Sequence, residues 1–198
     1  MNTGRNPIVA RSSSIARGKP YTTTKMSRIP GVMLGVVVGG PTAPTATVLE
    51  VFVDFMCPFS KRISERLVKE VKPHYGEKLK LVFHPMAQPW HPQGCAVHEC
   101  FHVAAAVDPS KQEAIYVATM DFANPTFCDV PAYDKTRRDI HEAFADVYES
   151  KCSLDKAAFL EGATIKQLPD GSINSGNAGT RMLKIYTKMH RQLGVHVS

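Results

Sequence analysis

The stretch that decides the fold is Val48-Leu49-Glu50-Val51-Phe52-Val53-Asp54-Phe55-Met56-Cys57-Pro58-Phe59-Ser60. Its first half is rich in valine and phenylalanine, which predicts a strand buried on both faces. After Pro58 the apolar residues change to a spacing of three and four, which predicts a helix as far as Val71. Proline fits the first turn of a helix, where its missing N–H has no partner to lose. We therefore expect Cys57 at a strand-to-helix junction.

This position favours a reactive thiol at Cys57. The unpaired N–H groups and the dipole at a helix N-terminus favour the thiolate, which is the form that attacks disulfides and binds soft metals. A random cysteine is more often a buried structural residue. The succession of strand, Cys-Pro and helix favours the reactive interpretation here.

The residues around this stretch predict a βαβ unit. A second strand is expected at 79–84, parallel to the first, and a further strand at 32–38 precedes both. A loop rich in proline follows at 85–92. The rest of the chain has helical periodicity, with Ser153 as one N-cap and Gly194 as the last helix end. Helices are expected over 95–107, 112–122, 133–148, 154–165 and 178–193.

With these motifs in place, residues 32–198 resemble the DsbA-like branch of the thioredoxin-fold family. In that branch a Cys-Pro-x-Cys motif closes a strand, and a helical segment follows the next strand. The resemblance implies an α/β fold in which 31–198 form one thioredoxin-like domain, with the βαβ core at 31–90 and a helical DsbA-type insertion at 95–193. It also implies a thiol–disulfide oxidoreductase in which Cys57 is the nucleophile and Pro58 sets the turn.

The sequence departs from the family pattern at two places. Ser60 stands where the family has its second, resolving cysteine, so the motif is a monothiol one. The Ser60 hydroxyl is expected to hydrogen-bond to the Cys57 thiolate. Residues 194–198 resemble the approach to the family's cis-proline, so we expect the closing strands to be missing and the apolar edge of the Cys57 strand to favour association.

These features predict a monothiol oxidoreductase that acts on protein or small-molecule thiols and disulfides. Because Ser60 cannot resolve a mixed disulfide at Cys57, glutathione is expected as an external co-substrate, and no bound cofactor is expected. Cys-Pro-Phe-Ser is also similar to the Cys-Gly-Phe-Ser site of monothiol glutaredoxins, which hold an iron–sulfur cluster; the proline and the helical insertion weaken that comparison. The alternative is a non-catalytic thioredoxin-like binding module.

A rival motif is His98-Glu99-Cys100-Phe101-His102, a His-Glu-x-x-His pattern. On a helix His98 and His102 would share one face and hold zinc, with Glu99 as the general base of a hydrolase. The pattern arises by chance in on the order of one per cent of such chains, and no third ligand stands at a family spacing. A mixed site with Cys95 and His91 is a further alternative. We expect no metal and a structural or substrate-facing role for this segment.

Five cysteines form an odd set, which favours reduced thiols in an intracellular compartment. Cys95 and Cys100 are candidates to resolve Cys57 if the fold brings them close. Cys128 and Cys152 are expected to be packed thiols.

The net charge of +6 lies entirely in the first 49 residues, which hold six basic and no acidic side chains. The remainder is balanced, so no nucleic-acid partner is expected. Residues 1–30 are typical of a disordered basic extension or a mitochondrial transit peptide. A secretory leader that begins at Met26 is a weaker alternative, so a mitochondrial or cytoplasmic location is expected. The longest apolar run is about a third of a bilayer span, so no membrane span is expected.

Overall fold

The structure is a computed structural model that describes residues 34–171, 173 and 175–196. These residues belong to the second of two compact units, Met33–Ser198. The predictions for residues 1–30, for the beginning of the first strand and for residues 197–198 lie outside the described residues.

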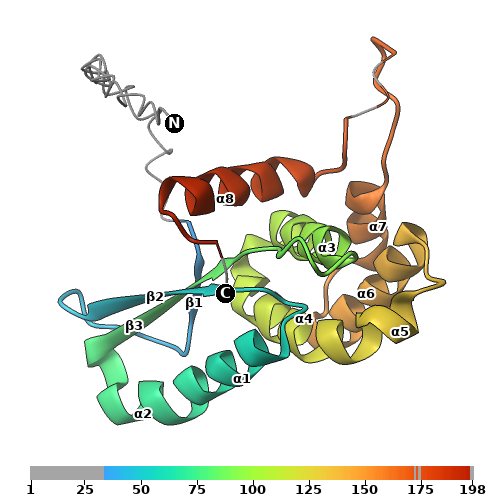
Figure 1. The fold of residues 1–198 in the computed structure, drawn as a ribbon. Coiled ribbons are helices and arrows are strands. Elements are labelled where there is room, and N and C mark those ends of the chain that lie inside the picture. The colour runs from blue at the N-terminus through green and yellow to red at the C-terminus, as the bar shows by residue number, and fades with distance from the viewer. Residues whose placement is uncertain (1–33, 172, 174, 197–198) are drawn as a thin grey trace, which may run out of the picture. The chain divides into compact units, whose positions relative to one another are not determined.

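Three strands form one sheet in the order β1-β3-β2 (Figure 1). Strand β3 is central and pairs parallel to β2, with Leu49 opposite Leu81, and antiparallel to β1. The parallel pair confirms the predicted βαβ unit. The strands are β1 (Val36–Val38), β2 (Thr47–Val53) and β3 (Leu79–Pro85).

The crossover between β2 and β3 is helical but extends beyond its predicted end at Val71. It consists of α1 (Pro58–Arg66), a π-helical turn (Leu67–Val71), α2 (Lys72–Tyr75) and a short 3-10 helix (Gly76–Lys78). The π-helical turn changes the hydrogen-bond register, and Pro73 falls in the first turn after it, where a missing N–H is tolerated. Gly76 ends the crossover helix with φ 54°.

Strand β2 differs from the sequence prediction in its burial. The prediction that it is buried on both faces is wrong for its first half, where Val48 is 51% exposed and Glu50 is exposed. The reason is that β2 lies at the edge of the described sheet, so its start has neighbours on one side only. Burial becomes complete at Val53. The strand is therefore held most firmly at the end that leads to Cys57.

The chain after β3 is helical, as predicted. In Figure 1, α1 and α2 lie below the sheet and α8 lies above it. None of the helices in the described part of the chain combines the length and the apolar character that crossing a bilayer requires. These helices are α3 (Gly94–Val107), α4 (Gln112–Phe127), α5 (Asp129–Ala132), α6 (Arg137–Cys152), α7 (Lys156–Ala163) and α8 (Thr180–Gln192).

Several predicted helix boundaries are wrong, and for the starts of α6 and α7 the reason is that another residue caps the helix. Asp155 caps α7 through its side chain, whereas Ser153, the predicted cap, is the left-handed C-cap of α6. Thr136 and Asp139 form a capping box, so α6 begins later than residue 133. Helix α4 continues past its predicted end at 122, and α8 begins after its predicted start at 178. Gly194 follows α8 with a positive φ, as predicted.

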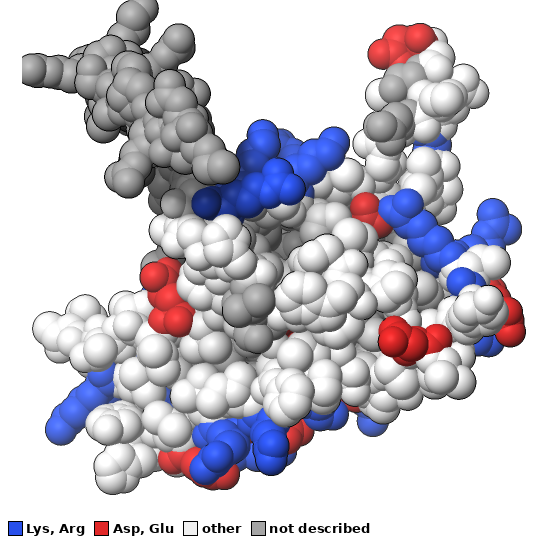
Figure 2. Space-filling model, viewed as in Figure 1, with Lys and Arg blue, Asp and Glu red and all other residues white. Residues whose placement is uncertain are grey.

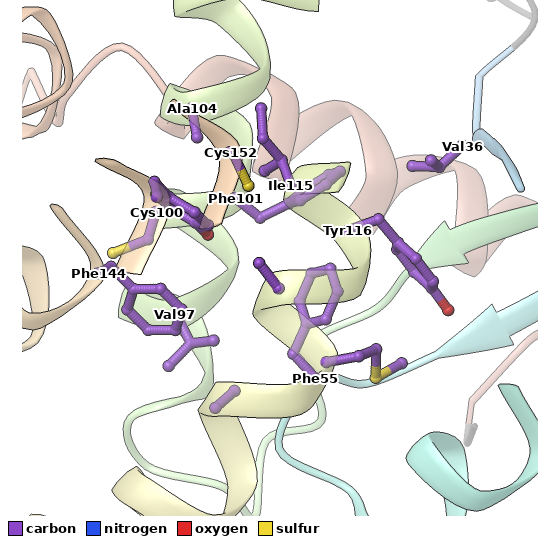
Figure 3. Packing of buried hydrophobic residues seen from close by; sticks show 14 of the residues in the cluster. Val36, Phe55, Val97, Cys100, Phe101, Ala104, Ile115, Tyr116, Phe144 and Cys152 are labelled. Atoms are coloured by element: carbon purple, nitrogen blue, oxygen red, sulfur yellow. The ribbon is translucent and has the colours of Figure 1, made fainter. Parts of the chain in front are cut away.

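The hydrophobic core joins the end of β2 to the helical region. Phe55 is fully buried, and its ring centroid lies 5.1 Å from that of Phe101 on α3 and 5.8 Å from that of Tyr116 on α4 (Figure 3). Complete burial of a phenylalanine contributes roughly 1.5–3 kcal/mol. Two helices therefore anchor the backbone immediately before Cys57.

Candidate functional site

Cys57 lies where the sequence predicts it, as the N-cap residue of α1 with Pro58 in the first turn. Its N–H donates to the carbonyl of Asp54 at 3.0 Å, and its carbonyl accepts the N–H of Lys61 at 3.1 Å. The residue is 7% exposed. The thiol is thus carried by a tight turn at the N-terminal end of a helix.

Ser60 connects the first turn of α1 to the end of β2. It is buried, and its Oγ accepts the N–H of Asp54 at 3.2 Å. The expected hydrogen bond between the Ser60 hydroxyl and the Cys57 thiolate stays a prediction. Phe59, between the two, is 71% exposed and places an apolar ring on the surface beside the turn.

Asp54, which the sequence analysis did not single out, organises the turn that presents Cys57. Its side chain is fully buried. Oδ1 accepts the N–H of Met56 at 2.9 Å, and Oδ2 accepts the N–H of Gln88 at 2.9 Å. The carboxylate therefore closes the turn and also fixes it to the loop after β3.

Two histidines complete the surroundings of this carboxylate. Nδ1 of His91 lies 2.7 Å from Oδ2, and Nε2 of His98 lies 3.0 Å from Oδ1. Burial alone would raise the pKa of Asp54, but the hydrogen bond and charge of His98, with the Met56 N–H and His91, outweigh it and lower the pKa to about 2. Asp54 is therefore ionised at neutral pH, with four donors around its two oxygens.

One signal in the sequence points to Asp54. An ionisable residue between Val53 and Phe55 interrupts an otherwise apolar segment. A buried carboxylate needs hydrogen-bond donors, so its position in a buried segment indicates polar partners elsewhere in the chain. The identity of those partners, His91 and His98, depends on tertiary structure.

The end of α4 holds both the Cys57 turn and the loop after β3. The side-chain amide of Asn124 donates to the carbonyl of Met56 at 2.6 Å. One turn later, the carbonyl of Phe127 accepts a hydrogen bond from the side-chain amide of Gln93. The turn that carries Cys57 is therefore fixed from three directions, by β2, by the loop and by α4.

The His-Glu-x-x-His residues lie on α3, but they contact different parts of the molecule. His98 bonds to Asp54, as described, while the ring of His102 stacks on that of Tyr186 with centroids 5.1 Å apart. Burial, and then the charge of His98, lower the pKa of His102 to about 3. No group of three or more His, Cys, Asp or Glu side chains in the described residues is arranged to hold a metal ion.

Glu99, the expected general base of a zinc hydrolase, is nearly buried, and its side chain connects α3 to two other helices. It forms an ion pair with Arg137 of α6 and accepts a hydrogen bond from the hydroxyl of Thr180 of α8 at 2.9 Å. The side-chain amide of Asn177 lies 3.5 Å away. These contacts support a structural function for Glu99.

All five cysteines lie in the described part of the chain and are free thiols. Cys152 is buried, as predicted, but the prediction for Cys128 is wrong because it lies exposed between α4 and α5. Cys100 is fully buried, and burial raises the pKa of its thiol well above the ordinary value. Cys100 is therefore a poor resolving thiol. Cys95 is exposed.

Comparison with known proteins identifies the fold. No protein-family model matches the chain, and no curated protein matches it. A structure from Pseudomonas syringae, assigned as a protein-disulfide isomerase, is 25% identical with a TM-score of 0.55, covering 76% of this chain and 78% of that one.

Two further solved structures agree in fold. The thiol–disulfide exchange protein alpha-DsbA2 from Wolbachia pipientis is 16% identical, with a TM-score of 0.52 over 80% of this chain and 71% of that chain. The thiol–disulfide oxidoreductase MdbA from Actinomyces oris is 13% identical, with a TM-score of 0.54 over 78% and 67%. The chain therefore has a mixed α/β, thioredoxin-like fold whose structural neighbours are DsbA-like thiol–disulfide oxidoreductases.

Proposed function

We propose that this chain is a monothiol thiol–disulfide oxidoreductase that uses Cys57 as its nucleophile. The observation that carries the proposal is the place of Cys57 as the N-cap of α1, on a turn held by the buried carboxylate of Asp54. The assignment of the Pseudomonas syringae structure as a protein-disulfide isomerase supports the same chemistry.

The reaction has two exchange steps. The Cys57 thiolate attacks one sulfur of a substrate disulfide, a mixed disulfide forms, and the other substrate sulfur leaves as a thiolate. Because Ser60 has no thiol, an external thiol such as glutathione then attacks the substrate sulfur, and Cys57 leaves as a thiolate.

The surface beside the turn fits a protein substrate. Phe59 is largely exposed, and Trp90, in the loop that contacts Asp54, is 53% exposed. Exposed aromatic side chains of this kind are frequent in surfaces that contact other proteins. We therefore include protein thiols and disulfides among the substrates.

A second candidate function is a non-catalytic thioredoxin-like binding module. The low exposure of Cys57 favours it, because a substrate sulfur needs a path to the thiolate. The two proposals differ in whether Cys57 reacts in the folded protein.

The test is mixed-disulfide formation with glutathione disulfide, followed at each cysteine by mass spectrometry. We expect fast modification at Cys57 and reduction of a disulfide reporter that Cys57→Ser abolishes. Cys128→Ser, which removes an exposed thiol elsewhere, is the matched control and should leave the rate unchanged. Equal rates in the wild type and in Cys57→Ser would refute the oxidoreductase proposal and leave the binding module.

We also propose that the protein works in a reducing, intracellular setting, either mitochondrial or cytoplasmic. The five free thiols support this proposal. Alkylation of thiols in intact cells tests it, and isolation of the protein with oxidised cysteines would contradict it.

A further inference from the structure

A cavity of about 700 Å³ opens between the first turns of α3 and the segment that joins α5 to α6. Its volume falls within the range of about 300–1,000 Å³ that is usual for small-molecule sites. The wall combines apolar side chains, such as Ala96 and Ile140, with the Cys95 thiol. The charged residues in the wall are Glu99, Asp129, Lys135 and Arg137.

The charges in this wall are of both signs. Glu99 and Arg137 pair with each other. Asp129 and Lys135 are exposed, and the charge of Lys135 also acts on the carboxylate of Asp139. A ligand that carries charge of only one sign would be repelled by either Asp129 or Lys135. A ligand with an ammonium group and a carboxylate can pair with both residues.

Hydrogen bonds to the last turns of α4 link the cavity wall to the Cys57 turn. Gln93 lines the cavity and donates to the carbonyl of Phe127. Asn124, three residues earlier, donates to the carbonyl of Met56. One helical turn rises about 5.4 Å, so the cavity rim and the backbone before Cys57 are held by neighbouring positions of one helix.

We propose that this cavity binds a small zwitterionic thiol of the glutathione type, which resolves the mixed disulfide at Cys57. The inference rests on the proposed function, because Ser60 cannot provide the resolving thiol. The thiolate of the bound ligand attacks the substrate sulfur, and the bond between that sulfur and Cys57 breaks. Cys57 leaves as a thiolate, and the substrate leaves as a mixed disulfide with the ligand.

Binding is tested first without any thiol chemistry. The probe is S-methylglutathione, which keeps the ammonium group and both carboxylates of glutathione but has no free thiol. Since Cys95 lies in the cavity wall, the probe should slow alkylation of Cys95 in a saturable manner and leave the rate at Cys128 unchanged. An unchanged rate at Cys95 with saturating probe would overturn the proposal.

The kinetic test uses Lys135→Glu with reduced glutathione as the resolving thiol. We expect KM for glutathione to rise about tenfold, the effect of roughly 1.4 kcal/mol of lost pairing. The rate at which Cys57 forms the mixed disulfide in a single turnover should not change. Arg138→Glu, an exposed charge reversal in the first turn of α6 and outside the cavity wall, should leave KM unchanged.

The outcomes separate this inference from the proposed function. An unchanged KM in Lys135→Glu, with Cys57 still active, would overturn the cavity proposal alone. An inert Cys57 in the wild type would overturn the proposed function. Cys95 protection by S-methylglutathione would then still support the cavity as a site for a zwitterionic ligand.

Discussion

Replacement of Asp54 by alanine tests whether one buried carboxylate holds the Cys57 turn. The change leaves two backbone N–H groups and two imidazole donors without their acceptor. His91 is 20% exposed and can bond to water instead, whereas His98 is fully buried. A buried donor without a partner costs about 1–3 kcal/mol, and breaking a buried charged pair costs about 3–5 kcal/mol.

Because such contributions do not add fully, we expect Asp54→Ala to lower the free energy of unfolding by about 3–5 kcal/mol. That is a large part of the roughly 5–15 kcal/mol typical of a folded domain. The assay is equilibrium urea unfolding at pH 7, followed by far-ultraviolet circular dichroism. Asp134→Ala, at an exposed position, is the control and should change stability by less than about 0.5 kcal/mol.

The same variant has a signature in its pH dependence. The pKa of Asp54 in the folded protein, about 2, lies below its ordinary value of 3.8. Its ionised form therefore stabilises the fold fully above pH 3.8, and this contribution is lost as the pH falls from 3.8 to about 2. The stability difference between wild type and Asp54→Ala should shrink over that range. A free energy of unfolding for Asp54→Ala within about 0.5 kcal/mol of the wild-type value at pH 7 would refute the reasoning.

Three further substitutions test the packing of α8 on α3. The imidazole of His102 stays neutral in the folded protein, whereas in the unfolded chain it binds a proton below about pH 6.5. His102 should therefore lower the free energy of unfolding by about 1.4 kcal/mol for each pH unit between pH 6.5 and about 3. His102→Phe keeps an aromatic ring against Tyr186 and should reduce that slope in urea unfolding; an equal slope would contradict this. A Cβ on Gly179 would lie 2.6 Å from the backbone carbonyl oxygen of Glu99, so Gly179→Ala should destabilise the protein by about 1–3 kcal/mol, and an unchanged thermal midpoint would argue against close packing there. Glu99→Gln should lower the free energy of unfolding by only about 1 kcal/mol, because Arg137 is partly exposed. If 1 M salt does not reduce this difference between wild type and variant, the ion pair is not its cause.

The local features of the fold could be predicted because they depend on short-range periodicity. The change of period at Pro58 placed Cys57 correctly, and the apolar run at 79–84 predicted β3. Caps were less certain, since Ser153 and Asp155 are both capping residue types two positions apart. Which one begins α7 depends on how α6 ends.

The features that failed depend on distant parts of the chain. Val48 is exposed because of the order of the strands in the sheet, which its own sequence does not encode. Apart from the Met56 N–H, the partners of Asp54 lie 34 to 44 residues further along the chain. No local pattern links these positions, so the apolar interruption at Asp54 indicates a buried polar cluster without naming its members.

The position of His98 links the two motifs that the sequence presents as rivals. His98 belongs to the His-Glu-x-x-His pattern, yet in the structure it bonds to Asp54, which holds the turn of Cys57. A substitution of His98 should therefore weaken thiol exchange at Cys57 as well as any zinc-dependent activity, and loss of activity alone cannot distinguish the two. Measurement of bound zinc, together with the Cys57 alkylation rate in His98→Gln, does distinguish them. A zinc-free wild type whose Cys57 reacts more slowly in the variant would show that this histidine serves the thiol site.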